Sequence, residues 1–346
     1  MKTYENILIV RTDRIGDVIL TTPAILALRE ANLGAKISIL VTPQTLDIVD
    51  GNPCLDEIFI DDRKGIHRGF WGFLKLVCML RKKKFDLAVV LHTKKRTNLL
   101  CFLSGIPSRI GYKNNKFGFL LTKGIPDQRP EGLKHEAEYC LDVLRHIGIN
   151  VQLDTLKLDM PLKEEANAWV ENIFSDNFIS SSEKVIAVHP GASCISKRWP
   201  AQRFAEVINS LGAPPFKVIL VGAPDNQQIA QQVLSGIKIP IIDLTGQTSV
   251  AQLASLFKRC RLLISNDSGP VHLAVAVGTP VISIFGRNQK GLSPTRWRPL
   301  GKKDIALHKE VGCEICLAHD CRLDFKCLQA VSVSEVVAAA KSLLSL

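Results

Sequence analysis

Short apolar runs alternate with helix-length segments along the first half of the chain. Four runs have the length of buried strands: residues 7–10, 37–41, 57–60 and 87–91. The second half repeats the pattern at residues 185–188, 217–221, 239–244, 262–265 and 281–285. Strands that alternate with helices are typical of parallel sheets covered on both faces. The pattern therefore predicts an α/β fold with two doubly wound Rossmann-like units.

The segment between these halves, residues 150–183, is polar and charged, with one short helical candidate at 163–174. Domain boundaries fall in such segments. We therefore expect an N-terminal domain over residues 1–160, a C-terminal domain over 161–332 and a final helix over 333–346. In this arrangement the turns that follow the strands of the two domains face a central cleft.

Composition and length limit the class of protein. The chain has 346 residues, of which 46% are hydrophobic, and this is enough apolar material for two cores. No apolar run reaches the roughly 18–20 residues that span a bilayer, and the first residues lack the pattern of a signal peptide. We expect a cytoplasmic protein.

The chain is basic, with 44 Lys and Arg against 33 Asp and Glu and a net charge of +11. This charge predicts an anionic partner, and nucleic acid, an anionic lipid surface and a phosphorylated small molecule all fit. The clusters at 81–84 and 94–96 also fit solvated helix ends. A metal-dependent nucleic-acid-binding protein is a remote alternative, because no helix-turn-helix or RNP motif is present.

Three turns that follow predicted strands carry candidate chemistry. The first, residues 10–17, lacks the three glycines of a dinucleotide fingerprint, and its Asp17 fits a helix cap and a catalytic base equally well. The second, 189–193, is followed by Lys197, and together they resemble a phosphate cradle without P-loop spacing. Lys197 also fits a surface charge.

The third turn, residues 264–272, ends a buried strand and begins a helix at Asp267, Ser268 and Gly269. Backbone N–H groups at such a helix start can hold a diphosphate. Asp267 would repel phosphate, and it is better suited to accept hydrogen bonds from sugar hydroxyls. His272 lies one turn later, and a structural role is its alternative.

Four of the ten cysteines lie within fifteen residues, at Cys313, Cys316, Cys321 and Cys327. In a cytoplasmic chain this clustering favours a metal site over disulfides. Zinc in a structural role is the leading prediction, and an iron–sulfur cluster and free thiols are the alternatives. A closed four-ligand site leaves no open position for catalysis.

Taken together, Arg-Thr-Asp-Arg-Ile-Gly-Asp at 11–17, His-Pro-Gly-Ala-Ser at 189–193, Lys-Arg-Trp-Pro at 197–200, Val-Gly-Ala-Pro at 221–224 and Asn-Asp-Ser-Gly-Pro-Val-His at 266–272 resemble glycosyltransferase family 9. This is the ADP-heptose:lipopolysaccharide heptosyltransferase family. The resemblance implies a GT-B fold, with an acceptor-binding N-terminal domain and a nucleotide-sugar-binding C-terminal domain. It also implies transfer of heptose from ADP-heptose to the inner core of lipopolysaccharide with inversion, and no cofactor for catalysis.

The resemblance also implies residue roles. Asp17 corresponds to the family's general base, and Ser193 and Lys197 to the groups that meet the donor phosphate. The element that holds the donor sugar and diphosphate corresponds to Asp267, Ser268, Gly269 and His272.

One position departs from the family pattern. Several heptosyltransferases hold the adenosine ribose with a glutamate where this chain has Asn226, beside Asp225. The nucleotide and sugar are therefore open, and a same-fold glycosyltransferase with another donor or acceptor is the alternative. Thr248 is a further candidate for lining the nucleotide pocket.

Basic residues near predicted strand ends are candidates for binding the acceptor, a lipid A–core glycolipid with phosphate and carboxylate groups. They are Arg63, Lys64, Arg96, Arg109 and Lys113, and each also fits an exposed charge. The family acts at the cytoplasmic face of the inner membrane, so the resemblance implies peripheral membrane contact. No amphipathic anchor is evident in the sequence.

Overall fold

The computed structural model describes residues 4–149, 151, 156–180, 182–212 and 216–345. The chain divides into two compact units, Met1–Pro130 with Lys134–Pro161, and Leu162–Leu346 with Glu131–Leu133. The sequence predicts the domain boundary after residue 160, and the structure changes from one unit to the other after Pro161. Of the predicted connecting segment, residues 150, 152–155 and 181 lie outside the described residues.

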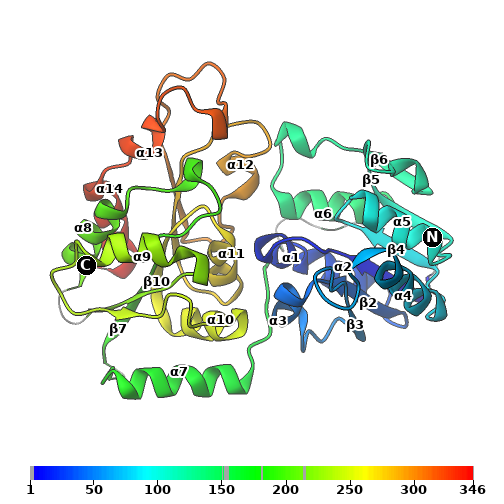
Figure 1. Cartoon of the computed structure of the whole chain (residues 1–346), viewed down its shortest axis with the longest axis horizontal. Coiled ribbons are helices and arrows are strands. Elements are labelled where there is room, and N and C mark those ends of the chain that lie inside the picture. The colour runs from blue at the N-terminus through cyan, green and yellow to red at the C-terminus, as the bar shows by residue number, and fades with distance from the viewer. Residues whose placement is uncertain (1–3, 150, 152–155, 181, 213–215, 346) are drawn as a thin grey trace. The chain divides into compact units, whose positions relative to one another are not determined.

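The first unit contains a six-stranded parallel sheet with the order β3-β2-β1-β4-β5-β6 (Figure 1). Its strands are β1 Asn6–Val10, β2 Lys36–Val41, β3 Glu57–Ile60, β4 Leu87–Val90, β5 Ser108–Lys113 and β6 Lys123–Pro126. The central strands β1 and β4 are almost entirely buried, as expected for continuous apolar runs covered on both faces.

Helices cover both faces of this sheet. They are α1 Ile15–Ile19, α2 Thr22–Ala31, α3 Leu46–Val49, α4 Gly69–Lys82, α5 Lys95–Leu103 and α6 Glu136–Arg145, with 3₁₀ turns η1 Pro43–Thr45, η2 Gly118–Leu120 and η3 Arg129–Glu131. α4 and α5 pack on one face, where Phe73, Leu76 and Leu100 join the strand residues of one core cluster. Right-handed crossovers place α2 on the other face, where it packs against α6.

The second unit repeats the architecture with the strand order β12-β11-β10-β7-β8-β9 (Figure 1). Its strands are β7 Lys184–His189, β8 Phe216–Leu220, β9 Ile242–Asp243, β10 Cys260–Asn266, β11 Val281–Phe285 and β12 Ile305–His308. Its helices are α7 Glu164–Asp176, α8 Ala201–Leu211, α9 Gln227–Leu234, α10 Val250–Arg259, α11 Gly269–Ala276, α12 Pro294–Trp297, α13 Lys326–Ala330 and α14 Val333–Leu344, with 3₁₀ turns η5 Ile195–Lys197, η6 Pro224–Asn226 and η7 Ala318–Asp320.

The C-terminal helix α14 is part of the second unit. It packs against α8, and Val336, Ala340 and Leu344 join Trp199 and Phe204 in one buried cluster. Among the helices that the structure describes, none is both long and apolar enough to cross a membrane. The side chains of the candidate site are positioned by the two sheets.

Candidate active site

Each sheet has one point where the direction of winding reverses. In the first sheet this point lies between β1 and β4, and in the second between β7 and β10. Ligands of open α/β sheets bind outside the carboxyl ends of the strands at this point. The residues that follow these four strands are therefore the ones to examine, and they include the three turns that the sequence predicts as sites.

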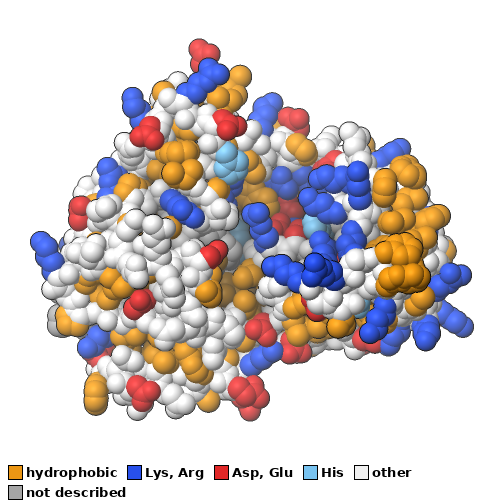
Figure 2. Space-filling view, viewed as in Figure 1, with side chains coloured by type: hydrophobic (Ala, Val, Ile, Leu, Met, Phe, Trp, Pro, Cys, Tyr) orange, Lys and Arg blue, Asp and Glu red, His pale blue; other side chains and the backbone are white. Residues whose placement is uncertain are grey.

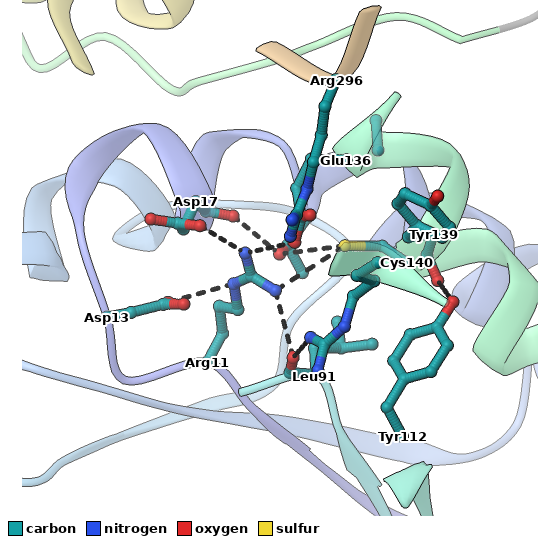
Figure 3. Close-up of polar contacts among 12 residues, drawn as sticks. Arg11, Asp13, Asp17, Leu91, Tyr112, Glu136, Tyr139, Cys140 and Arg296 are labelled. Atoms are coloured by element: carbon teal, nitrogen blue, oxygen red, sulfur yellow. Dashed lines mark hydrogen bonds and ion pairs between the residues drawn. The ribbon is translucent and has the colours of Figure 1, made fainter. Parts of the chain in front are cut away.

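A buried arginine forms the centre of the site in the first unit. Arg11 follows β1 and is 1% exposed, and its guanidinium contacts three carboxylates, as Figure 3 shows. The distances are 3.0 Å from Nε to Asp13 Oδ1, 2.8 Å from Nη2 to Asp17 Oδ1 and 3.0 Å from Nη2 to Glu136 Oε1. Nη1 donates to the carbonyl of Leu91, after β4, at 3.2 Å. Arg11 thus joins β1, α1, β4 and α6.

Burial and mutual charge interactions shift the pKa values of the residues in this cluster. Burial alone would lower the pKa of Arg11, but its carboxylates outweigh burial and raise that pKa above its ordinary value. Burial raises the pKa of Asp13 to about 7, and the charges of Asp17 and Glu136 act in the same direction against the attraction of Arg11. Asp13 therefore gains a proton far more readily than an ordinary aspartate.

Two further arginines, paired with one buried aspartate, lie beside this cluster. Arg96, in α5, donates to both carboxylate oxygens of the buried Asp61 at 3.0 and 2.7 Å, and Arg63 donates to the same carboxylate at 2.8 Å. Burial alone would raise the pKa of Asp61, but these arginines outweigh it and lower that pKa. Arg63 also donates to Thr12 Oγ1 at 2.5 Å, which places it next to the β1 turn.

His92 and Arg129 complete the carboxyl edge of the first sheet. His92 Nδ1 lies 3.1 Å from Thr12 Oγ1, and burial together with nearby cations, Arg11 foremost, lowers its pKa to about 3. His92 is therefore a neutral imidazole near pH 7. Arg129 pairs with Asp127 at 2.7 Å and lies over the ring of Tyr112, 4.3 Å from its centre. Several cations thus face this edge.

The structure brings some of the predicted acceptor residues together and separates another. Arg63 and Arg96 meet at Asp61. Lys64 is exposed in the loop after β3, and Lys113 is exposed at the carboxyl end of β5. Arg109 lies at the opposite, amino end of β5, where its guanidinium donates to the carbonyls of Ile106 and Leu120. Arg109 therefore lies at the amino edge of the sheet, away from the carboxyl edge where Arg63 and Arg96 meet.

In the second unit a carboxylate holds two cations. Asp267 follows β10 and is 4% exposed, and its Oδ2 lies 2.9 Å from Lys197 Nζ and 3.3 Å from Arg287 Nη2. Lys197 ends η5 and Arg287 follows β11. Asp267 therefore positions two cations at the carboxyl edge of the second sheet, where they could meet a phosphate.

Hydroxyls and the α11 helix start lie beside these cations. Ser268 occupies the N-cap position of α11 without a side-chain capping bond, and its Oγ lies 3.1 Å from Ser265 Oγ and 3.3 Å from His189 Nδ1. Burial lowers the pKa of His189 to about 4, so this imidazole is neutral near pH 7. Gly269 opens the helix, and His272 is buried one turn later.

The Asn226 side chain packs so close to the Gly191 backbone that no side chain larger than glycine fits at position 191. A Cβ on Gly191 would lie 2.1 Å from Asn226 Oδ1, which also accepts a hydrogen bond from the Ala223 N–H at 3.2 Å. Asn226 is 8% exposed, and its Nδ2 donates to Asp225. Ser193 is exposed in the turn after β7, and Thr248 is half-buried just before α10. Asn226 thus links the turns after β7 and β8.

The four clustered cysteines line one cavity of about 640 Å³ in the second unit, together with Ser196, Arg287 and His308. None of these four cysteines forms a disulfide. Among the described residues, no three metal-ligating side chains are grouped as they would be around an ion. The Asn288 N–H donates to Cys316 Sγ and the Phe325 N–H to Cys321 Sγ, each at 3.4 Å.

Several site residues were missed by sequence reasoning. Arg11 lies in the predicted turn at 10–17 but received no role, and Asp61, Arg129, Glu136 and Arg287 lie in no predicted motif. Charged residues beside strand ends are usually solvated, so the sequence did not predict that these residues are buried or paired. The partner of Arg11 on α6 is 125 residues away in the chain. A prediction would have required knowledge of which helix covers β1.

Comparisons with known proteins agree with this architecture. The model of glycosyltransferase family 9 (heptosyltransferase) matches residues 73–326. Lipopolysaccharide heptosyltransferase 3 of Escherichia coli strain K12 is 27% identical over 338 residues, which are 95% of each chain. The crystal structure of a family 9 glycosyl transferase from Veillonella parvula has a TM-score of 0.90 and 28% identity, covering 100% of this chain and 98% of that one. The structure of E. coli ADP-heptose lipopolysaccharide heptosyltransferase II has a TM-score of 0.80 at 22% identity, with 98% of each chain covered. The fold is GT-B.

The raised pKa of Asp13 predicts a pH-dependent effect of one substitution on stability. Folding favours the protonated side chain, so the stability that Asp13 contributes is complete below its ordinary pKa of 3.8 and is lost as the pH rises through about 7. Asp13→Asn mimics the protonated form at every pH. In thermal unfolding, the melting temperature of the variant should rise relative to wild type by a few degrees from about pH 5 to about pH 8.

The matched control is Glu30→Gln, which removes an exposed carboxylate from the same unit. Its difference from wild type should be the same at both pH values. A melting-temperature difference for Asp13→Asn that does not change with pH would contradict the raised pKa.

Proposed function

Because the chain belongs to glycosyltransferase family 9, we propose that this enzyme transfers heptose from ADP-heptose to the inner core of lipopolysaccharide with inversion. The names of its curated relatives support heptose as the transferred sugar and lipopolysaccharide as the acceptor. The observation that carries the proposal is the contrast between two carboxyl edges. One holds carboxylates on a buried arginine, and the other holds cations on a buried aspartate.

Asp17 is the general base in this proposal. It takes the proton of the acceptor hydroxyl as that oxygen forms a bond to the anomeric carbon of heptose. The bond from the anomeric carbon to the ADP phosphate oxygen breaks with its electron pair on that oxygen. Attack from the opposite face inverts the configuration. The contact with Arg11 supports this role, because it fixes a carboxylate whose side chain is 18% exposed.

Lys197 and Arg287 stabilise the charge on the departing ADP. Ser193, Ser268 and the backbone N–H groups from Gly269 onward add hydrogen bonds to the diphosphate, and His272 supports this turn from within α11. Asp267 accepts hydrogen bonds from sugar hydroxyls while it holds the two cations. Neither half of the scheme calls on a cofactor, because side chains supply both the base and the phosphate charges.

Asn226 and Thr248 line the ribose end of the donor in this proposal. Asn226 already uses Oδ1 for the Ala223 N–H and Nδ2 for Asp225, so the amide is held in one orientation. An amide at this position favours a second candidate, a family member with another nucleotide or sugar. Competition among ADP, UDP and GDP for the protein separates the two candidates.

The acceptor is a lipid A–core glycolipid, whose phosphate and carboxylate groups suit the cations of the first unit. Arg63, Arg96, Lys64 and Lys113 supply that charge. Arg109 is not placed to join them, because it lies at the amino end of β5. An acceptor of this kind is anchored in lipid, so the enzyme works from the cytoplasm at the inner face of the inner membrane.

We also propose that Cys313, Cys316, Cys321 and Cys327 hold a structural zinc ion. Backbone N–H groups that donate to two of the sulfurs favour thiolates, the form that binds metal. The four sulfurs line one cavity but are not grouped as a closed set, so binding would draw the loop around the ion. Free thiols are the alternative.

The loop that carries these cysteines contacts residues next to the two proposed donor-binding cations. Ser196, next to Lys197, has its Oγ 3.1 Å from His319 Nδ1. Cys327 Sγ lies 2.6 Å from the carbonyl oxygen of Gly286, next to Arg287; the thiol donates to this carbonyl, and as a metal ligand Cys327 would lose its proton and this hydrogen bond but keep its place beside Gly286. A metal that fixes the loop would therefore also fix the two cations that meet the diphosphate.

Two isosteric variants test the base. Asp17→Asn should lower kcat by about 10²–10⁴-fold with a small change in KM, because an amide cannot take the proton. Asp13→Asn should keep kcat within about tenfold. Its pH profile should differ from that of wild type mainly above about pH 7, because only there does wild-type Asp13 carry a negative charge beside Asp17. Steady-state kinetics with ADP-heptose from about pH 5 to 9 gives both results.

Near-wild-type turnover by Asp17→Asn would remove it as the base. A collapse of kcat in Asp13→Asn alone would transfer the role to Asp13. Melting temperatures of both variants, measured at the assay pH, show whether a loss of rate comes from unfolding.

For the cysteines, we predict about one equivalent of zinc per chain after purification without added metal, measured by elemental analysis. Cys316→Ser should lose most of that zinc, lower the melting temperature and raise the KM for the donor more than that for the acceptor. Cys78→Ser, which removes an exposed thiol of α4, is the control. Metal-free protein with an unchanged melting temperature would show that the four cysteines are free thiols.

A further inference from the structure

The positive charge of the chain is concentrated in one stretch of the first unit. Between residues 61 and 125 there are fifteen Lys and Arg against three Asp and Glu, which is a net charge of +12. The whole chain carries +11, so the remainder is close to neutral. The stretch runs from the end of β3 through α4 and α5 to β6, and it forms one side of the first unit.

The same stretch carries most of the exposed aromatic side chains. Among the described residues, the exposed aromatics are Phe70, Trp71, Phe102, Phe119 and Phe178, and only Phe178 lies outside it. Phe70 and Trp71 are 67% and 80% exposed and stack edge to face with ring centres 5.4 Å apart. Ile66, just before them, is 64% exposed. Figure 2 shows hydrophobic side chains gathered on the α4 and α5 side of this unit, with basic side chains around them.

The arrangement of α4 explains why these side chains face outward. Its inward positions, Phe73, Leu76, Val77 and Leu80, follow helical spacing and pack on the sheet. The outward stripe therefore begins with Phe70 and Trp71 and continues through the exposed Lys75 and Arg81. An amphipathic helix of a soluble domain ordinarily has polar residues along the whole of this stripe.

The loops after β3 and β5 meet at the first turn of α5. Arg96 donates to the His67 carbonyl at 3.1 Å and lies over the Phe73 ring. Lys95, its neighbour, lies 5.6 Å from the centre of the Phe117 ring, which stacks on Phe119. Ile66, Phe70 and Trp71 are thus on one side of this turn and Phe119 is on the other. We call these four residues, three aromatic and one aliphatic, the aromatic rim.

The aromatic rim borders the proposed acceptor edge. Arg63 lies in the same loop as Ile66, Arg96 lies in the first turn of α5 between the two sides of the rim, and both arginines meet at Asp61. A sugar that is bound by these arginines would have its lipid anchor beside the rim.

We propose that the aromatic rim and the surrounding lysines and arginines dock the protein on an anionic phospholipid bilayer. Trp and Phe insert at the headgroup level, and Lys and Arg bind the lipid phosphates. Protein interfaces are depleted in lysine, so the density of lysines favours lipid as the partner. The purpose of docking rests on the proposed function, but docking itself needs neither donor nor acceptor.

The test is flotation of the full-length protein with vesicles, in the absence of substrates. Vesicles with about 30% phosphatidylglycerol should bind it, and vesicles of phosphatidylcholine alone should not. Phe70→Ser with Trp71→Ser should weaken the partition by at least about tenfold. Lys75→Glu with Arg81→Glu should weaken it as well, and raising the salt should do the same for wild type.

Leu33→Ser is the matched control, because Leu33 is 81% exposed in the same unit but lies outside the stretch. It should bind vesicles as wild type does. Trp71 is the most exposed of the described tryptophans, so its fluorescence should shift to the blue on binding and the double serine variant should lose that shift. Melting temperatures confirm that each variant is folded.

Absence of binding to anionic vesicles, or equal binding by the rim variant and wild type, would overturn the proposal. Rim-dependent binding to single-stranded RNA without vesicle binding would overturn it in favour of nucleic acid. Transfer to a water-soluble core oligosaccharide should be unchanged in the rim variant. If wild type binds vesicles but transfers no heptose, the proposed function fails and docking stands.

Discussion

The ion-paired Arg11 is the interaction on which the first unit's site depends. A guanidinium is costly to bury, and that of Arg11, a residue only 1% exposed, is stable there because three carboxylates surround it, from the turn after β1, from α1 and from α6. The contact with Arg11 fixes where Asp17 lies, whereas burial and the charges of Asp17 and Glu136 raise the pKa of Asp13 against the attraction of Arg11. The ion pairs that stabilise the buried Arg11 at this edge therefore also position Asp17, the proposed base.

The second unit uses the opposite arrangement. Asp267 is the buried charge, and Lys197 and Arg287 are the groups that it holds in place. A buried anion that orients cations suits a phosphate-bearing ligand, whereas a buried cation that orients carboxylates suits a hydroxyl that must lose a proton. Two copies of one architecture thus provide the two different kinds of site that glycosyl transfer requires.

The sequence predicted the fold well where strands are buried on both faces. β1, β2, β4, β7, β8, β10 and β11 are continuous apolar runs, and the structure places a strand at each. The strands it missed, β5, β6 and β12, have polar residues or lie toward an edge, where burial is partial. The predicted strand over 239–244 is only Ile242–Asp243, because it is the edge strand of its sheet.

The candidate site was predictable only in part, for a related physical reason. Asp17, Lys197 and Asp267 lie in turns with a recognisable order of residue types. Glu136, Asp61 and Arg287 acquire their roles from partners that are far away in the chain, so local sequence contains no signal for them. Arg109 shows the converse, since a residue near a strand end lies at the ligand edge only if that end is the carboxyl end.

Product analysis tests the central claim, inverting heptose transfer, most directly. The purified protein is incubated with ADP-heptose and a heptose-deficient core acceptor, and the product is examined by mass spectrometry and NMR. The two contrasting carboxyl edges predict one added heptose whose anomeric configuration is opposite to that of the donor. A product with retained configuration, or no transfer from ADP-heptose under conditions in which another nucleotide sugar reacts, would contradict it.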